Sequence, residues 1–261
     1  MIDIHSHIVW DVDDGSPSID VSLEMLKIAR ESGTTDIVAT PHMNGEYTFQ
    51  PELVRERIGE LNAASGGTPV VHYGCEFHLS VDNLDLLTEG PRTYTINNKQ
   101  NLLLEFPDHH VGRHAETIIG QLLDSGIVPI IAHPERVPVL QKDPDRLGTW
   151  VDLGCLAQVT ALSMIGLFGR TAASTAEKFL ERGLAHVIAS DAHDPSYRHT
   201  RLAEAYAVVE AKFGEEAADS LFRDNPRCVV QGYAIAGGRQ IYAAQRPRKW
   251  WSFWKSGSEI D

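Results

Sequence analysis

Seven short apolar runs alternate with helical patterns along this chain, and this alternation restricts the fold more than any other feature. The runs predict strands at residues 2–8, 35–42, 69–77, 101–106, 128–134, 156–161 and 186–193. Between them, apolar residues recur at helical spacing, as Val54, Ile58 and Leu61 do after Pro51. Alternating strands and helices predict an α/β fold with a parallel sheet. Seven such units favour a barrel, although an open sheet fits the same pattern.

The length of 261 residues suits one barrel domain, which we expect at residues 1–236. Residues 237–261 are predicted to form a linker and a tail. The tail contains the run RKWWSFWK, which holds three of the five tryptophans of the chain beside basic residues. Such a run can lie in a membrane interface. Packing on the body or on a neighbouring molecule, or disorder, is the simpler interpretation.

Charge and hydropathy exclude several classes of partner. The chain has 36 acidic and 23 basic residues and a net charge of −13, so nucleic-acid backbones should repel it. It has no run of about 18 apolar residues, and we expect no transmembrane segment. The N-terminus, MIDIHSHI, begins as a strand without the basic and apolar regions of a secretion signal. We therefore expect a cytoplasmic protein.

Three cysteines, Cys75, Cys155 and Cys228, exclude one route to the hydrolysis of phosphate esters. None belongs to a CxxC pair, which fits a reducing compartment. A cysteine phosphatase needs an arginine six residues after its nucleophile, and none of the three has one there. The chain also lacks a GxxxxGK motif, so a P-loop is absent.

Side chains of the types that bind metals stand at the carboxyl ends of six of the seven predicted strands; only the strand at 156–161 has none. They are His5, His7, His42, Glu76, Glu105, His133, Asp191 and His193. The carboxyl ends of the strands in a parallel barrel meet at one rim, where active sites form. Each residue alone has a simpler explanation, such as a hydrogen-bonded histidine or a helix cap. Ionisable groups at the edge of a core are costly unless they are paired or metal-bound, so the repeated placement predicts a metal site.

This set of side chains is too large for one ion, which takes four to six ligands. The acidic run DVDDG after the first strand offers further oxygen ligands. Two or three ions that share a bridging carboxylate therefore fit better. Imidazole and carboxylate ligands without thiolate favour Mn²⁺, Fe²⁺ or Zn²⁺ over Cu⁺.

The segments that carry these residues resemble the polymerase and histidinol phosphatase (PHP) family. They are MIDIHSHIVWDVDDGS, IVATPHM, YGCEF, LLLEF, PIIAHPER, IASDAHDPSYR and DNPR, and they run from residue 1 to about residue 227. The chain is most similar to the manganese-dependent protein tyrosine phosphatases of bacterial capsule and exopolysaccharide operons. The resemblance implies a distorted (β/α)7 barrel of the PHP type over residues 1–236, Mn²⁺ as the metal, and hydrolysis of phosphotyrosine.

The resemblance also distributes the strand-end side chains over three ions. It implies His5, His7 and Asp191 on the first ion, Glu76 as a bridge between the first and second, Glu105 and His133 on the second, and His42 and His193 with an aspartate of DVDDG on the third. The spacing alone does not choose that aspartate. We take Asp14 as the ligand and Asp13 as the alternative.

Two arginines match those with which these phosphatases bind phosphate. Arg136 lies three residues after His133, and Arg198 lies five residues after His193. A guanidinium presents a planar fork to two phosphate oxygens and stays charged, although each arginine alone could be an ordinary surface ion pair. The implied substrate is a phosphotyrosine protein, namely a bacterial tyrosine kinase of polysaccharide export. Such a partner would bring the protein near the inner face of the membrane.

Other functions also fit the pattern. The same site suits histidinol phosphate or another small phosphomonoester, or a nucleic-acid end, against which the acidic composition argues. A metal-bound module that docks on a kinase or synthase without catalysis is a different class of answer. An amidohydrolase barrel also begins with HxH, but it commonly bridges its metals with a strand-end lysine, and no predicted strand ends in lysine.

Overall fold

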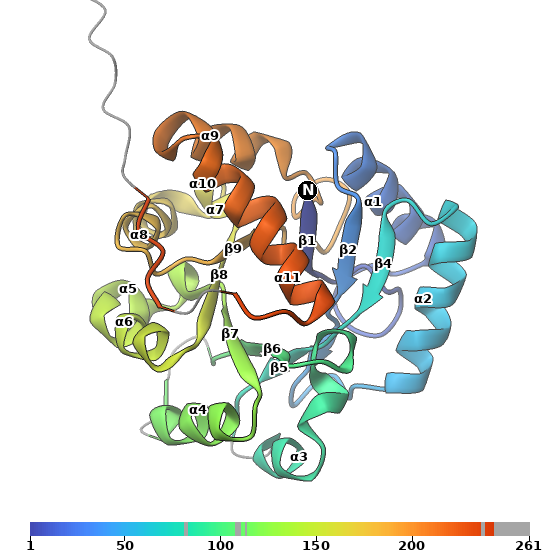
Figure 1. The fold of residues 1–261 in the computed structure, drawn as a ribbon. Coiled ribbons are helices and arrows are strands. Elements are labelled where there is room, and N and C mark those ends of the chain that lie inside the picture. The colour runs from blue at the N-terminus through green and yellow to red at the C-terminus, as the bar shows by residue number, and fades with distance from the viewer. Residues whose placement is uncertain (81–82, 108–110, 113, 236–237, 243–261) are drawn as a thin grey trace, which may run out of the picture.

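The structure is a computed structural model that describes residues 1–80, 83–107, 111–112, 114–235 and 238–242 (Figure 1). The tail RKWWSFWK lies outside the described residues. Strands occupy the middle of the molecule and helices surround them (Figure 1). In the described part of the chain, no helix is both long and apolar enough to cross a bilayer.

All strand pairs are parallel, as the alternating pattern predicted. The strands are β1 (Ile2–Ser6), β2 (Asp36–Ala39), β3 (His42–Met43), β4 (Val70–Tyr73), β5 (Glu76–His78), β6 (Asn101–Glu105), β7 (Val128–Ala132), β8 (Leu156–Thr160) and β9 (Val187–Ala189). They form one sheet in the order β1-β2-β4 and another in the order β3-β5-β6-β7-β8-β9. An isolated parallel bridge joins Ser6 to Ala192. The α/β fold is thus confirmed, and closure into one barrel stays a prediction because the hydrogen-bonded pairs define two sheets.

Two predicted strands are each divided in two by the structure. Residues 35–42 become β2 and β3, and residues 69–77 become β4 and β5. Pro41 interrupts the first because proline has no backbone N–H to donate to a ladder. At the second break the chain runs so close to β2 that a Cβ at Gly74 would lie 2.8 Å from Cγ1 of Val38. Both breaks carry the chain from one sheet into the other.

The α-helices alternate with the strands and then end the described fold, and short 3-10 or π-helical segments lie at Pro91–Tyr94, Ile96–Asn98, Pro134–Arg136 and Ser220–Asp224. The α-helices are α1 (Ile19–Glu31), α2 (Pro51–Ser65), α3 (Leu84–Glu89), α4 (Ala115–Asp124), α5 (Pro138–Lys142), α6 (Pro144–Leu153), α7 (Ala161–Met164), α8 (Gly169–Glu181), α9 (Ala203–Phe213), α10 (Glu215–Asp219) and α11 (Asn225–Gln231). The hydroxyl of Ser18 caps the start of α1 by accepting a hydrogen bond from the backbone N–H of Val21. Gly33, with φ of +85°, follows its end.

The two faces of the strands pack in two apolar clusters, because successive side chains of a strand point to opposite faces. In β6, Leu102 and Leu104 belong to the large cluster that includes the helices around the strands. Leu103 between them belongs to a smaller cluster with Val229 and Val230 of α11. Figure 1 shows α11 lying across the strands. Both faces of the strands are therefore covered, which leaves the strand ends as the place for polar groups.

Residues 238–242 pack against the body after α11. The Arg239 guanidinium pairs with Asp152 of α6 at 2.8 Å, and the backbone N–H of Gln240 donates to the carbonyl of Gly183 at 2.9 Å. The hydroxyls of Tyr242 and Ser220 are 2.9 Å apart. These residues of the predicted linker lie on the body, and the position of the domain boundary stays a prediction.

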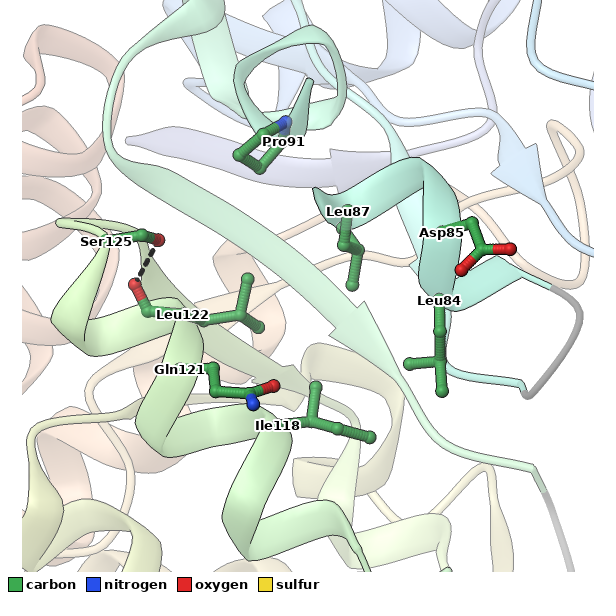
Figure 2. Close-up of a pocket in the computed structure, with 8 residues that line it drawn as sticks. All are labelled: Leu84, Asp85, Leu87, Pro91, Ile118, Gln121, Leu122 and Ser125. Atoms are coloured by element: carbon green, nitrogen blue, oxygen red, sulfur yellow. Dashed lines mark hydrogen bonds between the residues drawn. The ribbon is translucent and has the colours of Figure 1, made fainter. Parts of the chain in front are cut away.

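A groove of about 520 Å³ lies between α3 and α4 (Figure 2). Leu84 and Leu87 of α3 face Ile118 and Leu122 of α4 across it (Figure 2). Its other lining residues are Asp85, Pro91, Gln121 and Ser125. The groove is lined by none of the residues that the sequence predicted to form the metal site.

Candidate metal centre

The predicted ligands converge at the carboxyl ends of the strands, although they come from distant parts of the chain. Their nitrogen and oxygen atoms lie within 4.8 Å of one another in three overlapping groups, namely His5, His7, Glu76 and Asp191; His42, Glu76 and Glu105; and His7, Asp14, His42 and His193. His133 adjoins the second group, with Nε2 3.0 Å from Oε1 of Glu76 and 3.7 Å from Oε1 of Glu105. We call these nine residues the rim cluster.

Glu76 lies at the centre of the rim cluster. Its Oε2 is 3.2 Å from Nε2 of His5, 3.3 Å from Nε2 of His7 and 3.2 Å from Nδ1 of His42. Its Oε1 faces His133. Glu76 is the first residue of β5, and its side chain is almost fully buried. A carboxylate that faces four imidazoles in this way has the position that a bridging ligand requires.

The two neighbouring aspartates of the DVDDG run have different surroundings. Asp13 Oδ2 accepts hydrogen bonds from Nδ1 of His7 at 2.7 Å and from the backbone N–H of His42 at 3.0 Å. Asp14 turns the other way, and its Oδ1 lies 3.5 Å from Nε2 of His42 and 3.4 Å from Nε2 of His193. Asp14 thus faces two imidazoles of the rim cluster, Asp13 holds His7 by a hydrogen bond, and the choice of Asp14 as the ligand stays a prediction.

Gly15 lets this loop fold tightly over His7. A Cβ at Gly15 would lie 2.2 Å from the carbonyl oxygen of His7. The backbone N–H of Gly15 donates to Oδ1 of Asp13 at 3.0 Å. The close approach directs the two adjacent carboxylates to different partners, which spacing along the sequence could not reveal.

Gln158 of β8 contacts the rim cluster, and the sequence analysis did not predict this contact. Its Oε1 accepts from Nδ1 of His5 at 2.8 Å. When His5 is neutral with its proton on Nδ1, its Nε2 atom would carry a lone pair toward Glu76 and Asp191. The available signal was a polar amide inside the apolar run LAQVT. The strand that lacked a predicted ligand thus orients one.

Arg136 and Arg198 meet on one oxygen atom of the rim cluster. Both guanidiniums donate to Oδ2 of Asp191, Arg198 through Nη2 at 2.7 Å. Asp191 and His133, the residue three positions before Arg136, both have positive φ, at +53° and +31°. Non-glycine residues seldom adopt this conformation, and it is concentrated at functional sites. Because both arginines donate to the same oxygen of Asp191, they lie side by side at the edge of the cluster.

The buried carboxylates of the cluster are held ionised. Burial raises the pKa of Glu76, but the charge of His5 and the hydrogen bond of His133 outweigh it and keep the pKa well below its usual range. Burial likewise opposes ionisation of Asp191, and the charges of His5 and Arg198 help to lower its pKa well below normal. Burial, aided by the charge of His7, lowers the pKa of His193 to about 4. Ionised carboxylates and a neutral imidazole are the forms that bind metal.

Three buried polar atoms of the rim cluster lack hydrogen-bond partners within the described structure and are suited to bind a metal ion. Glu76 Oε2, His42 Nδ1 and His193 Nε2 have no hydrogen-bond partner among the described residues. A buried polar atom without a partner is costly. Divalent cations between these atoms would satisfy them, so the donor set suits a multinuclear metal site.

Comparison with known proteins identifies the family. The model of the capsular polysaccharide synthesis family CpsB/CapC matches residues 1–231. The tyrosine-protein phosphatase CpsB of Streptococcus pneumoniae is 35% identical over 90% of this chain and 100% of its own length. The chain belongs to the CpsB/CapC family.

Solved structures agree with this membership. One belongs to the structures of YwqE from Bacillus subtilis and CpsB from Streptococcus pneumoniae, which are described as unique metal-dependent tyrosine phosphatases. It has a TM-score of 0.85 at 33% identity, and the match covers 95% of this chain and 100% of the other. A β-aspartyl dipeptidase of Fervidobacterium islandicum AW-1 has a TM-score of 0.55 at 15% identity, covering 92% of this chain and 78% of the other. The second likeness concerns the fold alone. The resemblance drawn from the sequence motifs is confirmed.

Proposed function

We propose that this member of the CpsB/CapC family is a metal-dependent protein tyrosine phosphatase. The observation that carries the proposal is the meeting of Arg136 and Arg198 on Asp191, directly beside the buried imidazoles and carboxylates. This arrangement combines a binding place for cations with two planar cations for phosphate. The relatives CpsB and YwqE support the same activity.

The rim cluster would hold two or three divalent ions, and we take Mn²⁺ as the metal, with Fe²⁺ or Zn²⁺ as alternatives. His5, His7 and Asp191 would hold one ion, Glu105 and His133 a second, and Asp14, His42 and His193 a third, with Glu76 as the bridge between the first two. When bound, such ions would supply positive charge beside the phosphate and would lower the pKa of a water to near neutral.

The two arginines would bind the non-bridging phosphate oxygens. The Nε atom of Arg198 is buried and has no hydrogen-bond partner in the described part of the chain, so this guanidinium has donor capacity left for an anion. Fixed positive donors stabilise the charge that develops in the transition state. The leaving phenolate of phosphotyrosine has a pKa of about 10, so it needs less help from a general acid than an alkoxide.

The substrate would be a phosphotyrosine protein, and we propose a tyrosine kinase of polysaccharide export. The capsule-synthesis family supports this class of partner. The net charge of −13 argues against a nucleic-acid substrate. Through such a partner, the protein would act at the cytoplasmic face of the membrane.

The test is a substrate panel under Mn²⁺, with a tyrosine-phosphorylated peptide, the same peptide phosphorylated on serine, and histidinol phosphate. We expect the highest kcat/KM for the phosphotyrosine peptide. Chelation with EDTA should abolish this activity, and added Mn²⁺ should restore it. Turnover that survives thorough chelation would refute the metal site. Equal or better turnover of histidinol phosphate would identify a small-molecule phosphatase instead.

A further inference from the structure

Two exposed apolar side chains are sequence neighbours of Arg198 and of Phe168, whose ring contacts Arg136. Tyr197 is 85% exposed and directly precedes Arg198. Leu167 is 63% exposed and directly precedes Phe168. The ring of Phe168 lies 4.6 Å from Cζ of Arg136. Phe168 therefore places an aromatic ring against one of the two guanidiniums, and the exposed side chains of Leu167 and Tyr197 are the neighbouring residues along the two loops.

The loops that carry these side chains are held by their own hydrogen bonds. The carboxylate of Asp194 accepts from the backbone N–H groups of Tyr197 at 2.6 Å and Arg198 at 3.0 Å. The carbonyl of Arg198 accepts from the backbone N–H of the proposed ligand His193 at 2.8 Å. On the other loop, the backbone N–H of Leu167 donates to the α7 carbonyl of Leu162 at 2.9 Å. The backbone of such loops loses little further freedom when a ligand binds.

We propose that Phe168 and Tyr197, together with Leu167, form an apolar wall that receives the aromatic ring of phosphotyrosine. This inference rests on the proposed function. A phosphate bound by both arginines would point its ester substituent out of the buried cluster, where the ring of Phe168 packs on Arg136. An aryl ring there gains aromatic contacts and packs beside a guanidinium. The single methylene of phosphoserine is too short to cover the wall. The wall therefore selects aryl over alkyl phosphomonoesters.

The experiment measures binding rather than turnover. Phenylphosphonate and methylphosphonate share an oxyanion and differ only in the group that would meet the wall. Calorimetric titration of the Mn²⁺-loaded full chain should show phenylphosphonate binding about tenfold more tightly. Tyr197→Ala and Phe168→Ala should each bring this ratio toward one, and Tyr197→Phe should keep it.

Tyr233→Ala is the matched control, because Tyr233 is 63% exposed and lies beyond α11. It should leave the ratio unchanged. Binding of inorganic phosphate reports the arginines and the bound ions without the wall, and it should stay the same in every variant. A preserved ratio in both alanine variants would overturn the wall, as would an equal loss of phosphate and both phosphonates in Phe168→Ala. Selective binding of phenylphosphonate by a protein that does not hydrolyse phosphotyrosine would support the wall and refute the phosphatase.

Discussion

The rim cluster and the groove between α3 and α4 are opposite kinds of surface on one fold. In the rim cluster, Glu76 and Asp191 are at most 1% exposed and lie among imidazoles and guanidiniums. The groove measures about 520 Å³, and its walls are mainly aliphatic, with Leu84 and Ile118 facing each other (Figure 2). A buried carboxylate is costly unless it is compensated, whereas a partly exposed leucine is ordinary. In this molecule, buried charged side chains therefore indicate a reactive site better than the volume of a groove does.

The topology explains the difference. The rim cluster collects side chains from strand ends on both sheets, so each residue depends on partners far away in the sequence. The groove lies between the helices that follow β5 and β6, two consecutive units of the fold. Changes in the rim cluster should therefore alter metal content and activity, while changes in the groove should alter stability alone.

The largest effect should come from Glu76→Gln. The substitution removes the charge that faces four imidazoles, so we expect loss of bound metal and a fall in kcat of roughly 10³-fold or more. Elemental analysis and a phosphotyrosine-peptide assay measure the two effects.

Glu89→Gln is the control, because it removes an exposed carboxylate from α3 next to the groove. Metal content and activity should both remain at the level of the unaltered protein. If the two variants behaved alike, the contrast between the rim cluster and the groove would be wrong.

A smaller loss is expected for Arg198→Ala. Removing one of two guanidiniums from the phosphate site should lower kcat/KM on the order of 100-fold. Metal content should be unchanged, since arginine is not a ligand. Arg198→Lys keeps a charge but loses the fork and should recover only part of the activity. Arg201→Ala, at an exposed neighbour, should have no effect. Loss of metal in Arg198→Ala would instead show that Arg198 supports Asp191 structurally.

Much of the fold and the composition of the rim cluster could be predicted because both depend on local signals. Strand ends such as IVATPH and LLLEF place a polar residue directly after an apolar run. Parallel pairing then brings such ends together, as the register of Glu76 with Leu103 and His42 shows. Helix α6 also had a usable signal, which our prediction missed: Pro144 at its start and Leu147, Trp150 and Val151 on one face.

The rest depends on contacts that local patterns do not encode. The different surroundings of Asp13 and Asp14 accompany the close packing of Gly15 on His7. The role of Gln158 follows from its contact with His5, 153 positions away. The division of the predicted strand at residues 69–77 follows from the close approach of Gly74 to β2. Helices α3 and α5, with six and five residues, are too short to show a period of their own.

The contrast between Asp13 and Asp14 provides a third test within the rim cluster. Asp14→Asn should remove one ion from the full complement, because Asp14 faces His42 and His193 directly. Asp13→Asn should weaken metal affinity by about 10–100-fold through His7 and still allow full loading at high Mn²⁺. Metal titration of both variants measures this. Asp11→Asn, at an exposed position of the same loop, is the control. The reverse pattern would make Asp13 the ligand.

The smallest effect should come from the groove itself. Ile118→Ala trims a partly exposed side chain that faces it, and we expect a loss of about 1 kcal/mol of unfolding free energy with kcat/KM unchanged. Ile119→Ala, at the fully buried next position of α4, should cost about 3 kcal/mol by opening a cavity. Urea unfolding and peptide hydrolysis measure both. A folded Ile118→Ala protein that had lost activity would make the groove part of the functional surface, and the division between the two regions would then fail.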